Sequence, residues 1–152
     1  MARRTARPVK GPSAFWDTSA LVPLCVRQGT TPRTIALYKS CGVVVWWTTP
    51  VEIASALARL VRMKQLNYSD WAKARKLANA LADAWSVIQP LDAVRHKAMQ
   101  LVDRYDLRAA DALQLAAALV WCEDVPQGRV FLTADQKLQE AAMLSGFDAK
   151  QI

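Results

Sequence analysis

The chain contains few of the side chains from which zinc sites and redox pairs are built. Its 152 residues include one histidine, His96, and three cysteines, which are widely spaced and form no C-x-x-C pair. These counts argue against a zinc site and against a dithiol redox pair. A Ser-His-Asp triad would have to use His96, and nothing near it resembles a nucleophile elbow. Reduced thiols are typical of reducing compartments, so we expect a cytoplasmic protein.

Long apolar runs are also absent. No run approaches the ~20 residues that a transmembrane helix needs, so we expect no membrane span. The first 13 residues are basic, contain no acid and lack an apolar core, so they do not resemble a secretory signal. Pro8, Gly11 and Pro12 break any regular structure there. We therefore predict a flexible basic arm over residues 1–13 and a single domain over residues 14–152.

Acidic residues are outnumbered by basic ones. The formal net charge is +7 and the isoelectric point is about 9.7. Beyond the arm, a second basic group follows Glu52 and is opposed by Asp70; it consists of Arg59, Arg62, Lys64, Lys73, Arg75 and Lys76. Such a balance favours an anionic substrate that is held by its phosphates. The alternative is that these side chains only keep the protein soluble.

Apolar patterns alternate between short runs and helical stripes along the chain. The strands are expected over residues 13–16, 43–48, 87–88 and 130–133. Helices are expected over residues 19–27, 32–41, 50–63, 70–85, 92–105, 109–121 and 135–144. This alternation predicts an α/β fold, in which a small central parallel sheet lies between layers of helices in a three-layer α/β/α arrangement.

Four carboxylates fall where such a sheet would bring them together. Asp17, Glu52 and Asp135 each follow a predicted strand, and Asp111 lies in the first turns of the most apolar helix. In open α/β sheets, ligands bind outside the carboxyl ends of the strands. Clustered carboxylates repel one another unless a cation lies between them. Their hard oxygen atoms suit Mg²⁺ or Mn²⁺, so we predict that all four converge on a shared divalent cation.

Each of these acids also has a local explanation. Asp17 and Asp135 are adequate helix N-caps. Glu52 completes a capping box with Thr49. Asp111 lies near a helix N-terminus, where the helix dipole favours an acid. Capping accounts for each acid separately, but it does not explain why all four fall at the same edge of one sheet.

Four segments in order resemble the PIN-domain nucleases, most closely the VapC-type toxins of bacterial and archaeal toxin–antitoxin pairs. The likeness covers residues 14–147, and the segments that carry it are Phe15–Leu21, Thr49–Leu57, Leu107–Ala116 and Phe131–Leu138. Trp16 stands before the first acid, where the family tends to have a small or β-branched residue. The arm is longer than is usual in the family and is not covered.

The resemblance implies a metal-dependent endoribonuclease. By that likeness, Asp17, Glu52, Asp111 and Asp135 would be both the catalytic and the metal-binding residues of a Mg²⁺ site. Asp17 and Asp111 would be direct ligands, while Glu52 and Asp135 would act directly or through water. The hydroxyls of Ser19 and Thr133 would orient those carboxylates or a water molecule, although Ser19 also suits a helix N-cap.

The resemblance further implies partners. These are an RNA substrate, single-stranded or looped and frequently tRNA, a cognate antitoxin protein and a second copy in a homodimer. A different interpretation is a PIN-like RNA-binding or protein-docking module with little catalysis. An aspartyl-phosphate phosphatase starting at Asp17 would need a second acid where Ser19 stands. A DNA nuclease of related fold is a further alternative.

Overall fold

The computed structural model describes residues 11–152, so most of the predicted basic arm, residues 1–10, lies outside the described residues. The described part of the chain forms one parallel sheet of five strands in the order β3-β2-β1-β4-β5. The strands are β1 (Ser13–Trp16), β2 (Gly42–Trp46), β3 (Ser86–Ile88), β4 (Val130–Thr133) and β5 (Asp148–Gln151).

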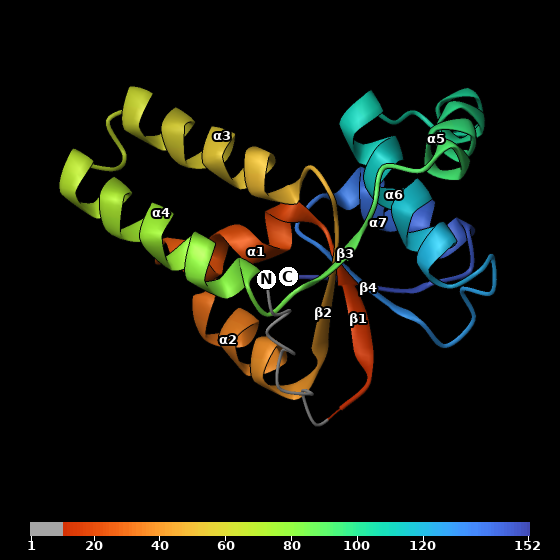
Figure 1. Cartoon of the computed structure of the whole chain (residues 1–152), viewed down its shortest axis with the longest axis horizontal. Helices are drawn as coiled ribbons and strands as arrows, with labels where there is room; N and C mark the ends of the chain where they lie inside the picture. Colours follow the sequence, from red (N-terminus) through yellow and green to blue (C-terminus); the bar gives the residue numbers. More distant parts are fainter. Residues whose placement is uncertain (1–10) are drawn as a thin grey trace, which may run out of the picture.

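Seven helices of the described residues connect and cover these strands. They are α1 (Thr18–Cys25), α2 (Thr31–Ser40), α3 (Thr49–Arg62), α4 (Tyr68–Ala82), α5 (Asp92–Arg104), α6 (Ala109–Trp121) and α7 (Gln136–Leu144). Helices α1 to α4 lie on one side of the sheet and α5 to α7 on the other (Figure 1). The predicted three-layer α/β/α fold is thereby confirmed.

The central strand β1 separates two hydrophobic cores. Successive side chains of a strand point to opposite faces of the sheet. Phe15 accordingly packs with α5, α6 and α7, where its ring stacks on Phe131 of β4 at 5.4 Å between centroids. Trp16 packs on the other face with α1 and α3, and both side chains are fully buried. Such strands are apolar throughout because both of their faces are covered.

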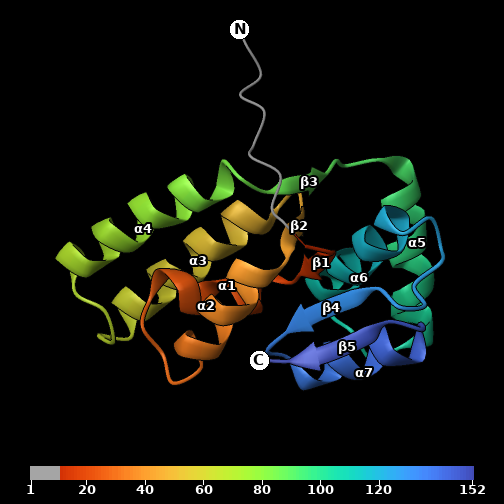
Figure 2. The same ribbon diagram turned by 90° about the horizontal axis from the view of Figure 1, so that it is seen from below.

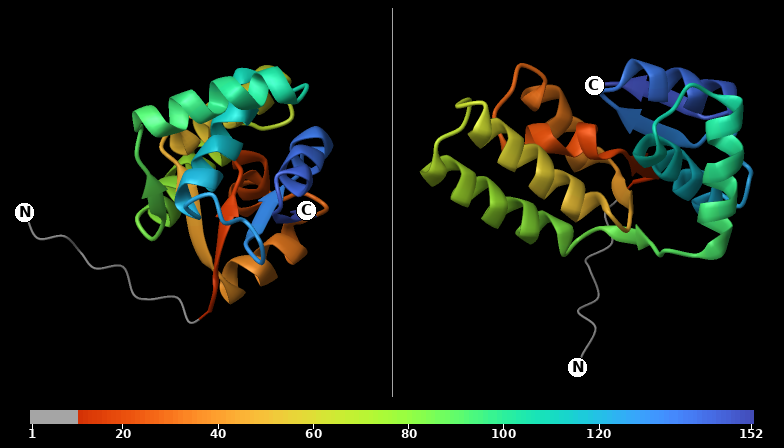
Figure 3. Two further views of the ribbon diagram at one scale, coloured as in Figure 1. Left: turned by 90° about the vertical axis from the view of Figure 1, so that its right-hand side faces the viewer. Right: turned by 90° about the horizontal axis from the view of Figure 1, so that it is seen from above.

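Helices α3 and α4 form a long antiparallel hairpin that extends away from the sheet (Figure 2). The pair lies side by side along most of its length (Figure 3). Asn67 caps α4 by accepting a hydrogen bond from the amide of Asp70, 2.8 Å away. The hairpin gives α3 a long exposed face beyond the end of the sheet.

Helix α6 is the most buried helix of the described residues. It begins and ends where the sequence predicted, and seven of its side chains are buried, from Ala112 to Leu119. Small alanine side chains let α6 approach both α5 and the sheet closely. Its N-terminus, and with it Asp111, is thereby fixed at the carboxyl edge of the sheet.

Two sequence predictions about this framework need correction. Strand β5 was not predicted, because its Asp-Ala-Lys-Gln sequence lacks the β-branched and aromatic residues that favour strands. It forms by parallel pairing of all four residues with β4. Helix α4 ends at Ala82 rather than Trp85, which turns back into the core. Within residues 11–152, no helix has the length and apolar character needed to cross a membrane.

Candidate metal centre and nucleic-acid interface

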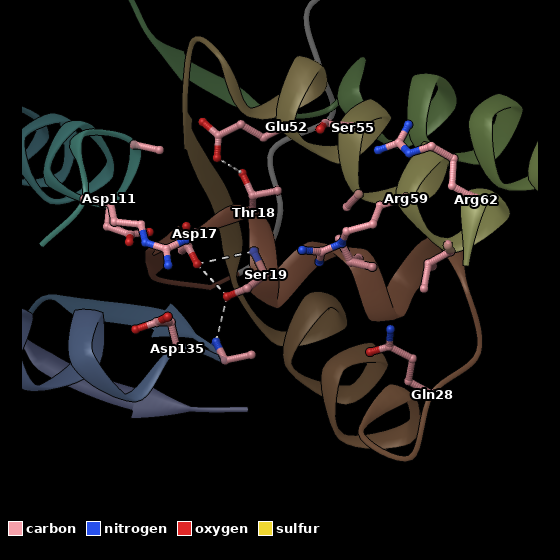
Figure 4. Close-up of a pocket in the computed structure, with 16 residues that line it drawn as sticks. Asp17, Thr18, Ser19, Gln28, Glu52, Ser55, Arg59, Arg62, Asp111 and Asp135 are labelled. Carbon is pink, nitrogen blue, oxygen red and sulfur yellow. Dashed lines mark hydrogen bonds between the residues drawn. The ribbon is translucent and has the colours of Figure 1, made fainter. Parts of the chain in front are cut away.

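The four predicted carboxylates all line one cavity of about 600 Å³ at the carboxyl edge of the sheet (Figure 4). Asp17 follows β1, Asp135 follows β4, and Glu52 lies in the first turn of α3 after β2. Asp111 lies in the first turn of α6. Four separate segments therefore place one acid each around a common space, as the topology of a parallel sheet allows.

Asp17 is buried, with 4% of its surface exposed. Its Oδ2 atom accepts hydrogen bonds from the Ser19 hydroxyl and amide and from the Thr133 hydroxyl. No described residue donates to Oδ1. The pKa of Asp17 is raised to about 6, chiefly by burial and to a smaller extent by the charges of Asp111 and Glu52, although the two hydroxyls act to lower it. The folded protein thus holds this carboxylate at a free-energy cost.

Ser19 and Thr133 connect Asp17 to the loop after β4. The Ser19 hydroxyl accepts from the Ala134 amide at 2.8 Å, and the Thr133 hydroxyl accepts from the Asp135 amide at 3.0 Å. Both hydroxyls therefore have their protons directed at Asp17. Helix α1 is capped by Asp17 rather than by Ser19, so that alternative for Ser19 was wrong.

Glu52 is fixed by a different set of donors. The hydroxyl of Thr18 lies 2.9 Å and the amide nitrogen of Gln114 3.1 Å from its Oε2, and the Thr48 hydroxyl donates to Oε1. The capping-box alternative is wrong because Thr48, not Thr49, is the N-cap of α3 and makes no side-chain cap bond. Glu52 is thus oriented by one local donor, Thr48, and by two tertiary donors, Thr18 and Gln114.

Asp111 and Asp135 are held more loosely. Asp111 is half-buried, and no described residue donates a hydrogen bond to its carboxylate. Burial raises its pKa, as do the charges of Asp135 and Glu52, while Arg108 lowers it. Asp135 is exposed and caps α7 by accepting from the Leu138 amide at 2.8 Å. Asp17 and Asp135 therefore do cap helices, and both also line the cavity.

The donor set fits a hard divalent cation. None of the four acids forms an ion pair with any residue of the described chain. As the side chains stand, no group of three or more His, Cys, Asp or Glu within residues 11–152 is ready to hold an ion. The carboxylates border the cavity without closing on a common point. A bound cation would have to draw them together.

Positive charge lines the same cavity. Arg108 lines it too, and its charge acts on Asp111. Arg59 and Arg62 extend from α3 along the opposite part of the wall (Figure 4). Arg59 and Arg62 belong to the basic group that follows Glu52 in the sequence, and they are the members of that group that line the cavity. Lys73 of that group is instead paired with Asp70.

No family model matches the chain, but individual proteins do. Ribonuclease VapC45 and ribonuclease VapC49, from two strains of Mycobacterium tuberculosis, are each 28% identical to it over 139 residues, covering 89% of this chain and 92% of theirs. The predicted resemblance to the VapC-type PIN-domain proteins is confirmed.

Solved structures share the fold of this VapC-like chain. A toxin–antitoxin complex from Klebsiella pneumoniae matches with a TM-score of 0.60 at 17% identity over 82% of this chain and 88% of its own. PAE2754 from Pyrobaculum aerophilum gives 0.60 at 21% identity, covering 93% and 92%. FitAcB from Neisseria gonorrhoeae gives 0.61 at 18%, covering 89% and 96%.

Sequence reasoning missed Thr18 and Gln114 in this site. Gln114 is completely buried, and its amide nitrogen also lies 3.1 Å from the Thr18 hydroxyl. One signal was available, because Gln114 is the one polar residue in the apolar stretch from Ala112 to Leu119. A buried polar side chain needs partners, and here the partners are in the site.

Proposed function

We propose that this chain is a Mg²⁺-dependent endoribonuclease and the toxin of a toxin–antitoxin pair. The observation that carries the proposal is the convergence of four acids, from four separate segments, on one cavity in which none has a cationic partner among the described residues. The relatives that cover most of the chain are named ribonucleases, which supports the same activity.

Asp17, Glu52, Asp111 and Asp135 would hold the cation, with Mn²⁺ as an alternative to Mg²⁺. When bound, a divalent ion there polarises the scissile phosphate, lowers the pKa of a water molecule and neutralises charge at the leaving oxygen. Asp17 would offer Oδ1, which receives no hydrogen bond from a described residue. Its Oδ2 is occupied by Ser19 and Thr133, which fix the orientation of the carboxylate.

Asp111 is the better candidate for accepting the proton of the attacking water. Both oxygens of Glu52 already accept hydrogen bonds, whereas the Asp111 carboxylate accepts none from the described residues. Glu52 would then serve chiefly to position the ion.

We propose unstacked RNA, single-stranded or in a loop, as the substrate class, with tRNA as the first target to test. Unstacked RNA exposes its backbone and base edges to a protein. An antitoxin partner, a homodimer and a cytoplasmic location complete the proposal. The antitoxin is supported by the solved toxin–antitoxin complex from Klebsiella pneumoniae that shares this fold. A short overlapping gene for a small DNA-binding protein, directly upstream, would support the pairing.

A second candidate is a PIN-like RNA-binding or docking module with little catalysis. It is favoured by the capping roles of Asp17 and Asp135 and by the lack of a ready three-residue metal group in residues 11–152. It predicts RNA binding that is indifferent to Mg²⁺. The nuclease proposal predicts cleavage that a chelator stops.

The test is to incubate the purified chain with total tRNA, with and without Mg²⁺ and chelator, beside Asp17→Asn. Matched single-stranded RNA and DNA oligonucleotides distinguish a ribonuclease from a DNA nuclease. Mg²⁺-dependent fragments of RNA that are absent with Asp17→Asn support the proposal. Intact RNA under all conditions, or fragments that are equal for both proteins, would overturn it.

A further inference from the structure

Acidic and basic side chains are separated along the part of the cavity wall that α3 forms. Glu52, Ser55, Ala56, Arg59 and Arg62 all line it. They recur at intervals of three or four residues, so they share one face of the helix. At 1.5 Å per residue, Arg59 lies about 10 Å and Arg62 about 15 Å along the axis from Glu52. The acids therefore occupy one end of the cavity and two arginines continue the same wall away from them.

Neither arginine is engaged by an acid. Both are exposed, and neither forms an ion pair or a side-chain hydrogen bond with a residue that the structure describes. Figure 4 shows both guanidinium groups turned towards the acidic end of the cavity. The two oxygens of Glu52, the acid on the same helix, accept instead from Thr18, Thr48 and Gln114. The donors of the two arginines remain available to an anion in the cavity.

From this placement we propose that Arg59 and Arg62 bind the phosphates that flank the reacting one, on one side of the cut. This proposal rests on the nuclease function proposed above, and it specifies which RNA substrates the nuclease can use. Guanidinium groups match phosphate oxygens in a bidentate fork. A phosphate opposite the acids would then be the reacting one, and the chain would continue along α3. The preferred substrate is therefore an RNA that extends beyond the cut in that direction.

Two properties follow. A short RNA that ends close to the reacting phosphate on the α3 side loses both contacts and becomes a poor substrate. Extending the other side does not compensate. Since each phosphate contact on single strands contributes roughly 0.7 to the slope of log affinity against log salt, each arginine should contribute that amount to the salt dependence.

The experiment crosses three variants with three RNAs. The variants are Arg59→Gln, Arg62→Gln and, as a matched control, Arg33→Gln, which removes the same charge from an exposed arginine of α2 outside the cavity. The RNAs share one cleavage site and are extended on the 5′ side, the 3′ side or neither. All variants should unfold at the temperature of the parent, because the changed side chains are exposed.

We expect each cavity variant to lose about ten-fold in kcat/KM, mainly through KM, on one of the extended RNAs, and much less on the other two. Arg33→Gln should stay within about two-fold throughout. Equal losses on all three RNAs, or losses no larger than that of Arg33→Gln, would overturn the assignment of phosphate contacts.

A binding assay in chelator separates this inference from the proposed activity. If the parent cleaves no RNA with Mg²⁺, the nuclease function is wrong. The arginine contacts are still decided by fluorescence anisotropy with the extended RNA. Weaker binding and a shallower salt slope for Arg59→Gln and Arg62→Gln, but not for Arg33→Gln, support them. Unchanged binding refutes them.

Discussion

The carboxylate site has two unlike halves. Asp17 and Glu52, the tethered half, are held by hydroxyl and amide donors from α1, α6, the end of β4 and the loop after β2. Asp111 and Asp135, the open half, accept no hydrogen bond from a side chain of the described residues; Asp135 accepts only from the Leu138 amide. The comparison indicates that one half is organised in advance, at a cost in stability. The other can move towards a cation and substrate.

Removing the charge of Asp17 should have the largest effect. Asp17→Asn keeps the size of the side chain but loses a proposed ligand, so we expect RNA cleavage to fall by about a thousandfold or more. The same variant should be more stable than the parent, because it no longer buries a carboxylate. Cleavage rates with Mg²⁺, paired with thermal unfolding, measure both. If Asp17→Asn cleaves RNA at the rate of the parent, Asp17 is not part of the catalytic site.

Stability without divalent cations should depend on pH through Asp17. Its pKa is about 6 in the folded protein and 3.8 when unperturbed, so its contribution to stability is largest below pH 4 and is lost as pH rises through 6. The full loss is about 3 kcal/mol. Denaturant unfolding from pH 4 to 8 should show the unfolding free energy of the parent decreasing relative to that of Asp17→Asn as the pH rises. If the difference in unfolding free energy between the two proteins stays constant with pH, it contradicts the raised pKa that burial is argued to give Asp17.

The open half is tested by a substitution that preserves its capping role. Asparagine caps helices as well as aspartate does, so Asp135→Asn should change the unfolding free energy by less than about 0.5 kcal/mol. If Asp135 also acts in the site, cleavage should fall by about a hundredfold. Asp92→Asn, at the start of α5 and outside the cavity, is the control. Full cleavage activity in Asp135→Asn would mean that Asp135 acts only as the N-cap of α7.

Removing a side chain that supports the tethered half should give the smallest effect. Thr18→Val keeps the shape but removes the hydroxyl that donates to Glu52 and accepts from Gln114. Changes to residues that orient ligands typically cost 10–100-fold, so we expect about ten-fold in kcat, with Thr18→Ser close to the parent. If valine and serine behave alike, the hydroxyl has no role in orienting Glu52.

The sequence predicted the fold where local pattern and tertiary environment agree. Strands β1 and β4 and helix α6 have continuous apolar signals, and their predicted bounds match the structure. Strand β5 was missed because it is polar and depends on pairing with β4. No local signal identifies such an edge strand.

The candidate site divides in the same way. The position of each acid after a strand or at a helix start was enough to place all four at one edge. The hydrogen bonds that orient them were not predictable, since Thr18 is 96 residues from Gln114 in the chain. The local capping-box pattern at Glu52 even indicated the wrong partner, because Glu52 accepts from the neighbouring Thr48 and from the distant Thr18 and Gln114 instead.

Calorimetric titration of Mg²⁺ into the purified chain at pH 7.5 tests the central claim most directly. We predict saturable binding that disappears in Asp17→Asn, weakens in Asp135→Asn and is unchanged in Asp92→Asn. Absence of saturable binding to the parent, or binding to Asp17→Asn with the parent's affinity, would contradict a shared cation between these carboxylates.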